Sequence, residues 1–349
     1  MTDTEGVALK PDLGRFGVWT GGPVPPEQAS AIEGLGYGAL WVGGSPAAGL
    51  EFAEPILAAT EHLQLATGIV NIWTAPADEV AESYHRIEKA YPGRFLLGIG
   101  VGHPEHTEQY TKPYDALVAY LDALDAALVP TSRRVIAALG PRVLELARDR
   151  SAGAHPYLTT PEHTAQAREL VGNTVFLAPE HKVVLTRDAV QARESGRKTV
   201  DFYLDLSNYV NNWRRLGFTA DDVARPGSDK LIDALVAHGT PEMIAARLRE
   251  HLDAGADHVA IQVLGSRRDL VPTLTELAGP LGLTQGQPGV GTTFCVRLFL
   301  PEMTGEPRGV QFDARGWRAF APDDSAVVFG APSGVVRSFA ITDLPSGVA

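Results

Sequence analysis

Two apolar runs flanking a helical pattern constrain the fold of this chain more than any other feature. The runs at 65–69 and 95–99 lack polar alternation, which is typical of parallel strands that are covered on both faces. Between them, Val80 and Tyr84 recur at the spacing of one helix face. Such a strand, helix, strand unit predicts an α/β protein whose chemistry lies at the carboxyl ends of parallel strands.

The same organisation extends along most of the chain. Candidate strands fall at 14–19, 38–42, 64–69, 94–100, 134–139, 152–157, 174–185 and 258–264. Helical patterns separate them, and Thr160 and Thr240 each precede a Pro-Glu pair, which is typical of a helix start with a Thr N-cap. The sequence therefore predicts eight strands connected by helices.

Collinear words of sequence resemble the luciferase-like monooxygenase superfamily and, within it, the coenzyme F420-dependent oxidoreductases of actinobacterial type. The words are ATGIVNIW, ESYHRIE, YPGRFLLGIGVGHPE, YDALVAYLDALD, ALGPRVLELARDRSAGAHPYLTTPEHT, LAPEHKVVL, YVNNWRRLGF and AGADHVAIQVL. They span about residues 14–284. The resemblance implies a TIM (β/α)8 barrel over residues 1–284, with an insertion before the last strand in which YVNNWRRLGF forms a lid or a dimer-contact helix.

Residues 285–349 depart from this family and are expected to be a linker and a short C-terminal extension of unknown role. The expected linker is Gln-Gly-Gln-Pro-Gly at 285–289, and residues 302–349 are rich in Gly, Pro and Ser. We expect a poorly ordered appendage or a small β element there.

Composition favours a cytoplasmic enzyme. The 349 residues are 44% hydrophobic, and 42 acidic against 30 basic residues give a net charge of −12, which predicts no general affinity for nucleic acid or anionic membrane. The sequence shows neither a signal peptide nor an apolar run of membrane-spanning length. The one cysteine, Cys295, excludes an internal disulfide. Relatives are commonly dimers, so a homodimer is possible.

The resemblance places the cofactor ring at the end of the third strand. It implies a non-prolyl cis peptide at Gly68-Ile69 that backs the ring, where an ordinary β bulge is the alternative. Asn71 is expected to hydrogen-bond ring or substrate. Trp19 and Trp73 are expected to line the pocket beside the ring or the substrate. The alternative is that they only pack in the hydrophobic core, which is equally common for an aromatic residue at a barrel end.

The fourth strand leads into residues that we expect at the barrel mouth. Gly102 would let the backbone approach the planar ring, and His106 would face the cofactor. His103 occupies the position of a family glutamate and is expected to donate or accept a proton, since histidine titrates near neutral pH; the alternative is a histidine bonded to the loop backbone. Two histidines separated by Pro104 and Glu105, without a third ligand, predict no metal site.

A phosphate site is expected after the fifth strand, at Gly140 and Pro141, where relatives bind the phosphodiester with backbone amides. Exposed amides and the dipole of a helix N-terminus favour an anion. Thr159 and Thr160 would add hydroxyl donors, unless Thr160 is occupied as an N-cap. His155 ends the sixth strand and is expected in the substrate pocket.

The sequence and its resemblance together predict an oxidoreductase that uses coenzyme F420 to transfer a hydride to or from a small organic substrate. The alternatives are an FMN-dependent monooxygenase on the same barrel and a non-catalytic barrel that acts as a binding or scaffold protein.

Overall fold

The computed structural model describes residues 10–102 and 112–283 in full. Beyond them it describes the backbone of five short strands between residues 297 and 338. The chain divides into two compact units, Met1–Gly286 and Gln287–Ala349.

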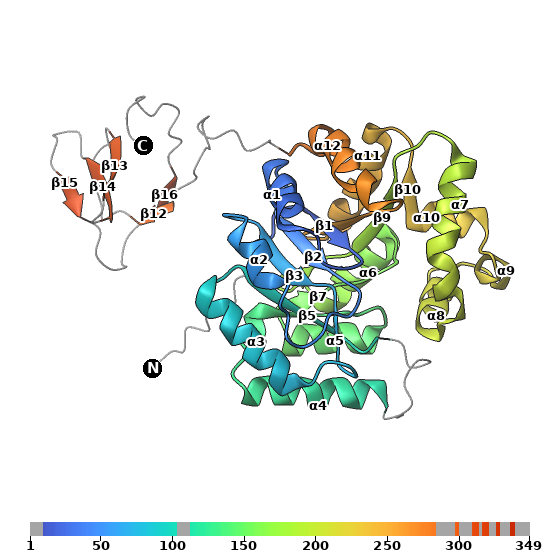
Figure 1. Cartoon of the computed structure of the whole chain (residues 1–349), viewed down its shortest axis with the longest axis horizontal. Coiled ribbons are helices and arrows are strands. Elements are labelled where there is room, and N and C mark those ends of the chain that lie inside the picture. Colours follow the sequence, from blue (N-terminus) through green and yellow to red (C-terminus); the bar gives the residue numbers. More distant parts are fainter. Residues whose placement is uncertain are drawn as a thin grey trace. The chain divides into compact units, whose positions relative to one another are not determined.

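The first unit is built on a curled parallel sheet that closes into a barrel (Figure 1). Its strands are β1 (Phe16–Thr20), β2 (Ala39–Val42), β3 (Gln64–Thr67), β4 (Val70–Asn71), β5 (Phe95–Gly100), β6 (Arg134–Ile136), β7 (Gly153–Ala154), β8 (Phe176–Leu177), β9 (Glu180–Val184), β10 (Val236–His238) and β11 (Val259–Val263). The order around the sheet is β10-β9-β11-β1-β2-β3-β5-β6-β7-β8, and β4 pairs with β5.

Two short consecutive strands, β8 and β9, complete the barrel between β7 and β11. β8 pairs with β7, and β9 pairs with β11. Ala178 lies between them and donates its backbone N–H to Ala154, while the carbonyl of Pro179 accepts from Ala260. The hydrogen-bond ladder therefore runs around the whole barrel, and the predicted eight-stranded TIM barrel is confirmed. Strand β10, beside β9, was not predicted.

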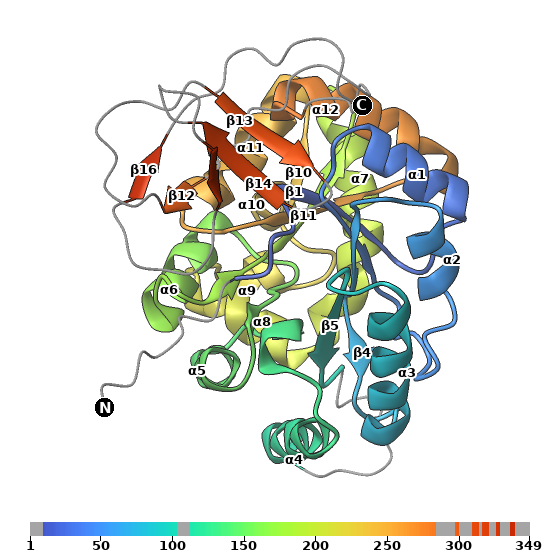
Figure 2. The same ribbon diagram turned by 90° about the vertical axis from the view of Figure 1, so that its left-hand side faces the viewer.

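Helices surround the strands (Figure 2). They are α1 (Pro26–Gly34), α2 (Ala53–Ala58), α3 (Ala77–Ala90), α4 (Pro113–Ala126), α5 (Pro141–Arg150), α6 (Pro161–Val171), α11 (Pro241–Asp253) and α12 (Leu270–Leu281). Two short 3-10 turns, at Thr131–Arg133 and Arg267–Asp269, precede β6 and α12. Helix α3 buries Val80, Tyr84 and Ile87 as its spacing predicts.

The barrel interior is packed with a few large side chains opposite small ones. Trp41 is fully buried, stacks on the His155 ring at a centroid distance of 4.2 Å, and donates its indole N–H to His258 Nε2. The buried members of this interior cluster are Leu13, Trp19, Ala39, Trp41, Ala66, Leu96, Val135, Phe176, Ala178 and Ala260. Because the interior is filled, ligands have access only at its ends.

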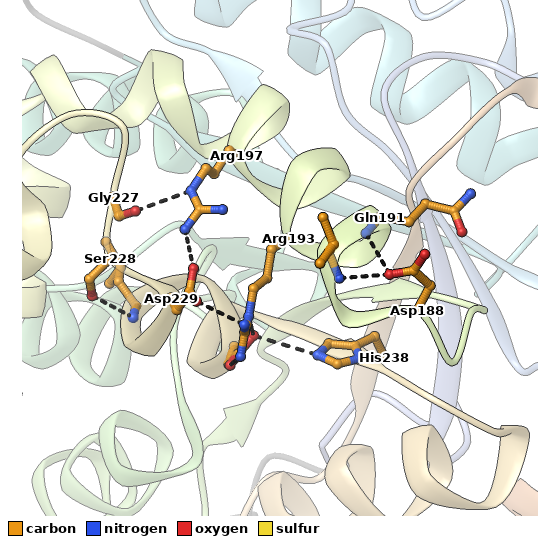
Figure 3. Close-up of polar contacts among 11 residues, drawn as sticks. Asp188, Gln191, Arg193, Arg197, Gly227, Ser228, Asp229 and His238 are labelled. Atoms are coloured by element: carbon orange, nitrogen blue, oxygen red, sulfur yellow. Dashed lines mark hydrogen bonds and ion pairs between the residues drawn. The ribbon is translucent and has the colours of Figure 1, made fainter.

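The predicted insertion before the last barrel strand is present and has its own core. It consists of α7 (Ala189–Val200), a 3-10 turn (Asp201–Asp205), α8 (Ser207–Arg215), α9 (Ala220–Val223), α10 (Asp229–Leu235) and β10. Ion pairs join α7 to α10: Arg193 contacts Asp229 and Asp233, and Arg197 contacts Asp229 (Figure 3). These pairs are partly exposed, so each contributes little stability, and the apolar core holds the insertion together.

The second unit contains two small antiparallel sheets. Strand β12 (Arg297–Phe299) pairs with β16 (Val336–Ser338), and β14 (Gly316–Phe320) pairs with both β13 (Gly309–Asp313) and β15 (Ala326–Val328). Within the residues that the structure describes, no helix combines the length and apolar character needed to cross a membrane.

Candidate functional site

The third barrel strand is interrupted at the position that the sequence predicts. Strand β3 ends at Thr67, β4 begins at Val70, and the peptide bond between Gly68 and Ile69 is cis. The Thr67 hydroxyl donates to the carbonyl oxygen of Gly98 and accepts from its N–H, both at 2.8 Å. This buried pair of hydrogen bonds fixes β5 beside the interruption, and the predicted cis bond is confirmed.

Trp19 and His155 both reach Gly68 from other strands. The Trp19 indole N–H donates to the Gly68 carbonyl at 3.1 Å, and a Cβ atom on Gly68 would lie 3.4 Å from His155 Nε2. His155 donates from Nδ1 to the Ala178 carbonyl at 2.7 Å. Burial lowers the pKa of His155 to about 4, so the ring is neutral and Nε2 keeps a lone pair that has no partner. Three predicted residues thus meet below the barrel mouth.

Asn71, Gly102 and Trp73 form a second group beside the first. The Asn71 side-chain oxygen accepts from the backbone N–H of Trp73 at 3.0 Å. Gly102 has φ +61°, and a Cβ atom there would lie 2.5 Å from the Asn71 amide nitrogen, so both the conformation and the close approach favour glycine. The buried Trp73 indole nitrogen has no partner. His103 and His106 lie outside the described residues.

The predicted phosphate site lies between the N-termini of α5 and α6. Gly140 is the N-cap of α5, no side chain caps this helix, and Pro141 is its first residue. His163, in the first turn of α6, donates from Nε2 to the Leu139 carbonyl at 2.8 Å and so ties the two helix starts together. Pro141 has no N–H and the Val143 N–H donates to the Gly140 carbonyl, which leaves the N–H of Arg142 as the first-turn amide available to an anion.

The two threonines at the start of α6 do not cap it. Thr160 is the N-cap residue, but its hydroxyl accepts from no amide of the helix, so the expectation of a Thr160 side-chain cap is wrong. Thr240, in the same Thr-Pro-Glu context, does accept from the N–H of Met243. Thr159 is buried, and its hydroxyl has no hydrogen-bond partner. The hydroxyls of Thr159 and Thr160 are therefore two buried donors without a hydrogen-bond partner at this position.

Helix α8 of the insertion adds two residues that sequence reasoning missed. Asn212 is 1% exposed, and its amide nitrogen has no partner, while its side-chain oxygen accepts from Arg215 at 3.2 Å. The same Arg215 nitrogen, Nη2, lies 3.8 Å from where a Cβ on Gly140 would stand. The i, i+3 spacing of Asn212 and Arg215 predicts a shared helix face, but nothing in the sequence shows that this face meets α5.

The arrangement is suited to an anion. Thr159 and Thr160 stand at the start of α6, and Arg215, which bonds Asn212, brings its guanidinium near Gly140 at the start of α5. The hydroxyls of both threonines and the Asn212 amide have no partners, and helix dipoles and a guanidinium all favour negative charge. Within residues 10–102 and 112–283, no cluster of three or more His, Cys, Asp or Glu could hold a metal ion.

The family model of the luciferase-like monooxygenases matches residues 25–258. The chain belongs to this family. No curated protein matches this luciferase-like chain.

Solved structures share the luciferase-like fold at low sequence identity. An F420-dependent secondary alcohol dehydrogenase in complex with an F420-acetone adduct superposes with a TM-score of 0.59 at 12% identity, covering 76% of this chain and 98% of the other. The coenzyme F420-dependent tetrahydromethanopterin reductase from Methanopyrus kandleri gives 0.60 at 14% identity, covering 77% and 99%. The oxygenating constituent of 3,6-diketocamphane monooxygenase from Pseudomonas putida, in complex with FMN, gives 0.56 at 12% identity, covering 78% and 97%.

Proposed function

We propose that this luciferase-like protein is an oxidoreductase that uses coenzyme F420 and transfers a hydride between the deazaflavin and a small organic substrate. The sequence words that resemble F420-dependent enzymes support this, and two of the structural neighbours are F420-dependent. When bound, a deazaflavin supplies a carbon centre that donates or accepts hydride. The chain's own residues bind it, orient it and manage the accompanying proton.

The unpartnered donors at the start of α6 and on α8 support a cofactor that carries a phosphate, and the resemblance to F420-dependent enzymes favours F420 among such cofactors. A buried donor without a partner costs about 1–3 kcal/mol, so side chains arranged in this way point to a ligand that accepts their hydrogen bonds. The Thr159 hydroxyl, the Asn212 amide and the Arg215 guanidinium suit the phosphodiester of F420. Trp19 and His155 lie at Gly68, where the resemblance places the ring.

The phosphate of FMN satisfies the same donors, and one neighbour binds FMN, so an FMN-dependent monooxygenase is the second candidate. Titrating the protein with F420, FMN and phosphate-free riboflavin, followed by tryptophan quenching, separates the possibilities. Preference for F420 supports the proposal, and preference for FMN favours the monooxygenase. Failure to bind any of the three would overturn both and favour a non-catalytic barrel.

A charge reversal tests the phosphate site itself. Gly140→Glu places a carboxylate against the proposed phosphodiester and should weaken F420 binding about 10- to 100-fold, the equivalent of losing a charge-assisted hydrogen bond. Gly279→Glu, on the exposed face of α12, adds the same charge where a Cβ meets nothing within 4 Å and is the matched control. Equal affinities for the two variants would remove Gly140 from the site.

The proton partner proposed for the reaction is His103. His103→Ala should lower turnover and leave F420 affinity nearly unchanged, because an imidazole that only moves a proton contributes little to binding. Unchanged turnover would show that another group holds the proton.

A further inference from the structure

His163 is a buried histidine at the proposed phosphate site whose second ring nitrogen has no assigned role. It lies in the first turn of α6, is 3% exposed, and donates from Nε2 to the Leu139 carbonyl at 2.8 Å. Because a carbonyl oxygen can only accept, this hydrogen bond places the proton of the neutral ring on Nε2. Nδ1 therefore carries a lone pair, and this buried atom has no hydrogen-bond partner.

The His163 ring lies among the groups that would surround the phosphate. Side chains of a helix lean towards its N-terminus, so a residue in the first turn is directed to the helix start. Leu139, which the ring bonds, directly precedes Gly140 at the start of α5, and Arg215 of α8 acts on the ring through its charge. The Arg215 guanidinium also lies near Gly140. The ring thus stands between the two helix starts and this guanidinium.

The orphaned atoms at this helix start differ in what they can offer an anion. The hydroxyls of Thr159 and Thr160 rotate, so they can donate to a phosphate oxygen at any pH. The Nδ1 lone pair of His163 cannot, because phosphate oxygens that carry no proton are also acceptors. This atom becomes a partner for such an oxygen only when it takes up a proton, which makes both ring nitrogens donors.

The protein alone does not supply this proton near neutral pH. Burial lowers the pKa of His163, the hydrogen bond to Leu139 opposes this shift, and the charge of Arg215 lowers the pKa further. The ordinary pKa of histidine is about 6.5, so the ring is neutral at pH 7. An anion beside Nδ1 favours the charged ring and therefore raises the same pKa.

Two other buried histidines lie near His163 and stay neutral. His251 of α11 bonds Thr164 at 2.8 Å and His181 of β9 at 2.9 Å. Burial lowers the pKa of His251 to about 3, and burial also lowers that of His181. The charge of a protonated His163 lowers the pKa of His251 further, so these rings do not take up the proton in its place.

The charged groups nearby keep their charge across the neutral range. Arg215 faces His163 from α8, and Arg142 lies in the first turn of α5. Glu162 precedes His163 in α6, and its carboxylate is attracted by Arg247 of α11. Arginines stay protonated and exposed carboxylates stay ionised between about pH 6 and pH 9. Among these groups, His163 is the one whose charge can change when an anion binds.

We propose that His163 binds the phosphate of the cofactor and takes up one proton as it does so. This inference rests on the proposed function, because it takes the phosphate to lie between the starts of α5 and α6. The proton moves from solvent to Nδ1, which donates it in a hydrogen bond to a phosphate oxygen, and no covalent bond of the cofactor changes. The affinity for the cofactor therefore rises as pH decreases.

Calorimetry of F420 binding in two buffers with different heats of ionisation counts the protons taken up. A phosphodiester does not titrate near neutral pH, whereas a phosphate monoester such as FMN has a second pKa of about 6, so F420 is the first probe. We expect His163 to account for up to about one proton per F420 near pH 7.5, and for a rise in affinity of up to about tenfold per pH unit decrease. This contribution is the difference between wild type and a variant that cannot take up the proton.

Two amide variants distinguish phosphate binding from the structural bond to Leu139. His163→Gln places an amide near the position of Nε2, so it can keep the Leu139 bond but offers nothing at Nδ1. It should lose the proton uptake and bind F420 about tenfold more weakly than wild type at pH 6.5, the loss of a charge-assisted bond. His163→Asn places an amide donor near Nδ1 and loses the Leu139 bond. It should also show no uptake, yet bind F420 more tightly than His163→Gln at pH 9.

A purely structural His163 predicts the opposite order, with His163→Gln close to wild type and His163→Asn impaired. His85→Gln is the matched control, because His85 is an exposed histidine whose Nε2 lies 2.8 Å from the Ala127 carbonyl, and it should keep the wild-type uptake. Equal proton uptake by wild type and either folded His163 variant would overturn the proposal. If one of these variants does not fold, the other decides, since both should lose the uptake.

The choice of probe keeps this inference separable from the proposed function. Binding of F420 with the same uptake in wild type and His163→Gln rejects only the role of His163. If neither F420 nor FMN binds, the oxidoreductase is rejected, and inorganic phosphate tests the site alone. Phosphate binding with an uptake that His163→Gln loses supports a proton-linked anion site, and no binding of phosphate at millimolar concentration overturns it.

Discussion

Trp213 anchors the insertion to the barrel, and its replacement gives the most informative test of the architecture. The side chain is fully buried, and its indole N–H donates to the Leu158 carbonyl at 3.1 Å. Leu158 has φ +52°, a left-handed conformation that costs a non-glycine residue about 1–2 kcal/mol. Its N–H donates to Glu180 at 3.1 Å, so one hydrogen bond on each side holds this residue.

Trp213→Phe keeps most of the ring but removes the hydrogen bond. The lost bond and the small void should lower the free energy of unfolding by about 2–3 kcal/mol. Trp213→Ala removes the whole ring and should cost about 3–5 kcal/mol. At about 2–4 °C per kcal/mol for a domain of this size, the Phe variant should melt about 4–12 °C lower.

Thermal melting followed by circular dichroism measures the loss of stability. The ratio of FMN affinity to riboflavin affinity measures phosphate recognition and so reports whether α8 keeps its position. This ratio should fall in both variants, because α8 carries Asn212 and Arg215 to the phosphate site. Val190→Ala, on an exposed position of α7, is the control and should change neither quantity. A Phe variant that melts like wild type would refute the anchoring role of the Trp213 bond.

Three further results are expected from local features. Gly98→Ala should destabilise the barrel by several kcal/mol, since its Cβ would clash with the Thr67 carbonyl, whereas Gly279→Ala in open space should be neutral or slightly stabilising; urea melts compare them. Thr240→Ala should cost about 1 kcal/mol by losing a helix cap, whereas Thr160→Ala should cost less stability and reduce FMN affinity instead. Burial lowers the pKa of His155 to about 4, below its value of about 6.5 in the unfolded chain, so its contribution to stability should be complete above about pH 6.5 and fall as pH decreases towards 4, measured by urea midpoints.

Sequence reasoning predicted the parts of this protein that depend on local pattern. All eight barrel strands contain apolar runs that are recognisable in the sequence without knowledge of their neighbours. The interruption at Gly68-Ile69 could be located because the segments on both sides of it resemble those of the family. The glycine at 140 and the helix start after it also lie in one continuous motif. Each of these features is determined within about ten residues of chain.

The partners supplied by the insertion were not predictable in this way. Arg215 lies near Gly140 although 75 positions separate them in the sequence, and nothing in the local sequence of either residue predicts this contact. The side-chain spacing placed Asn212 and Arg215 on one helix face, but the docking of that face depends on Trp213 and Leu158, which is a matter of tertiary packing. The prediction that the Thr160 side chain caps α6 was wrong for a related reason. Thr160 and Thr240 share the same Thr-Pro-Glu motif, and only their surroundings in the folded protein differ.

The segment 157–160, directly after the sixth barrel strand, connects both halves of the proposed site. The Tyr157 ring lies over the Lys182 ammonium and against Trp19, Leu158 bonds both Glu180 and Trp213, and Thr159 and Thr160 stand at the start of α6. Because these residues are consecutive, a displacement of the insertion at Leu158 moves the substrate side and the cofactor side together. Damage to the Trp213 anchor should therefore weaken the binding of FMN and, to a smaller extent, of riboflavin in the same variant, whereas Gly140→Glu should weaken FMN alone.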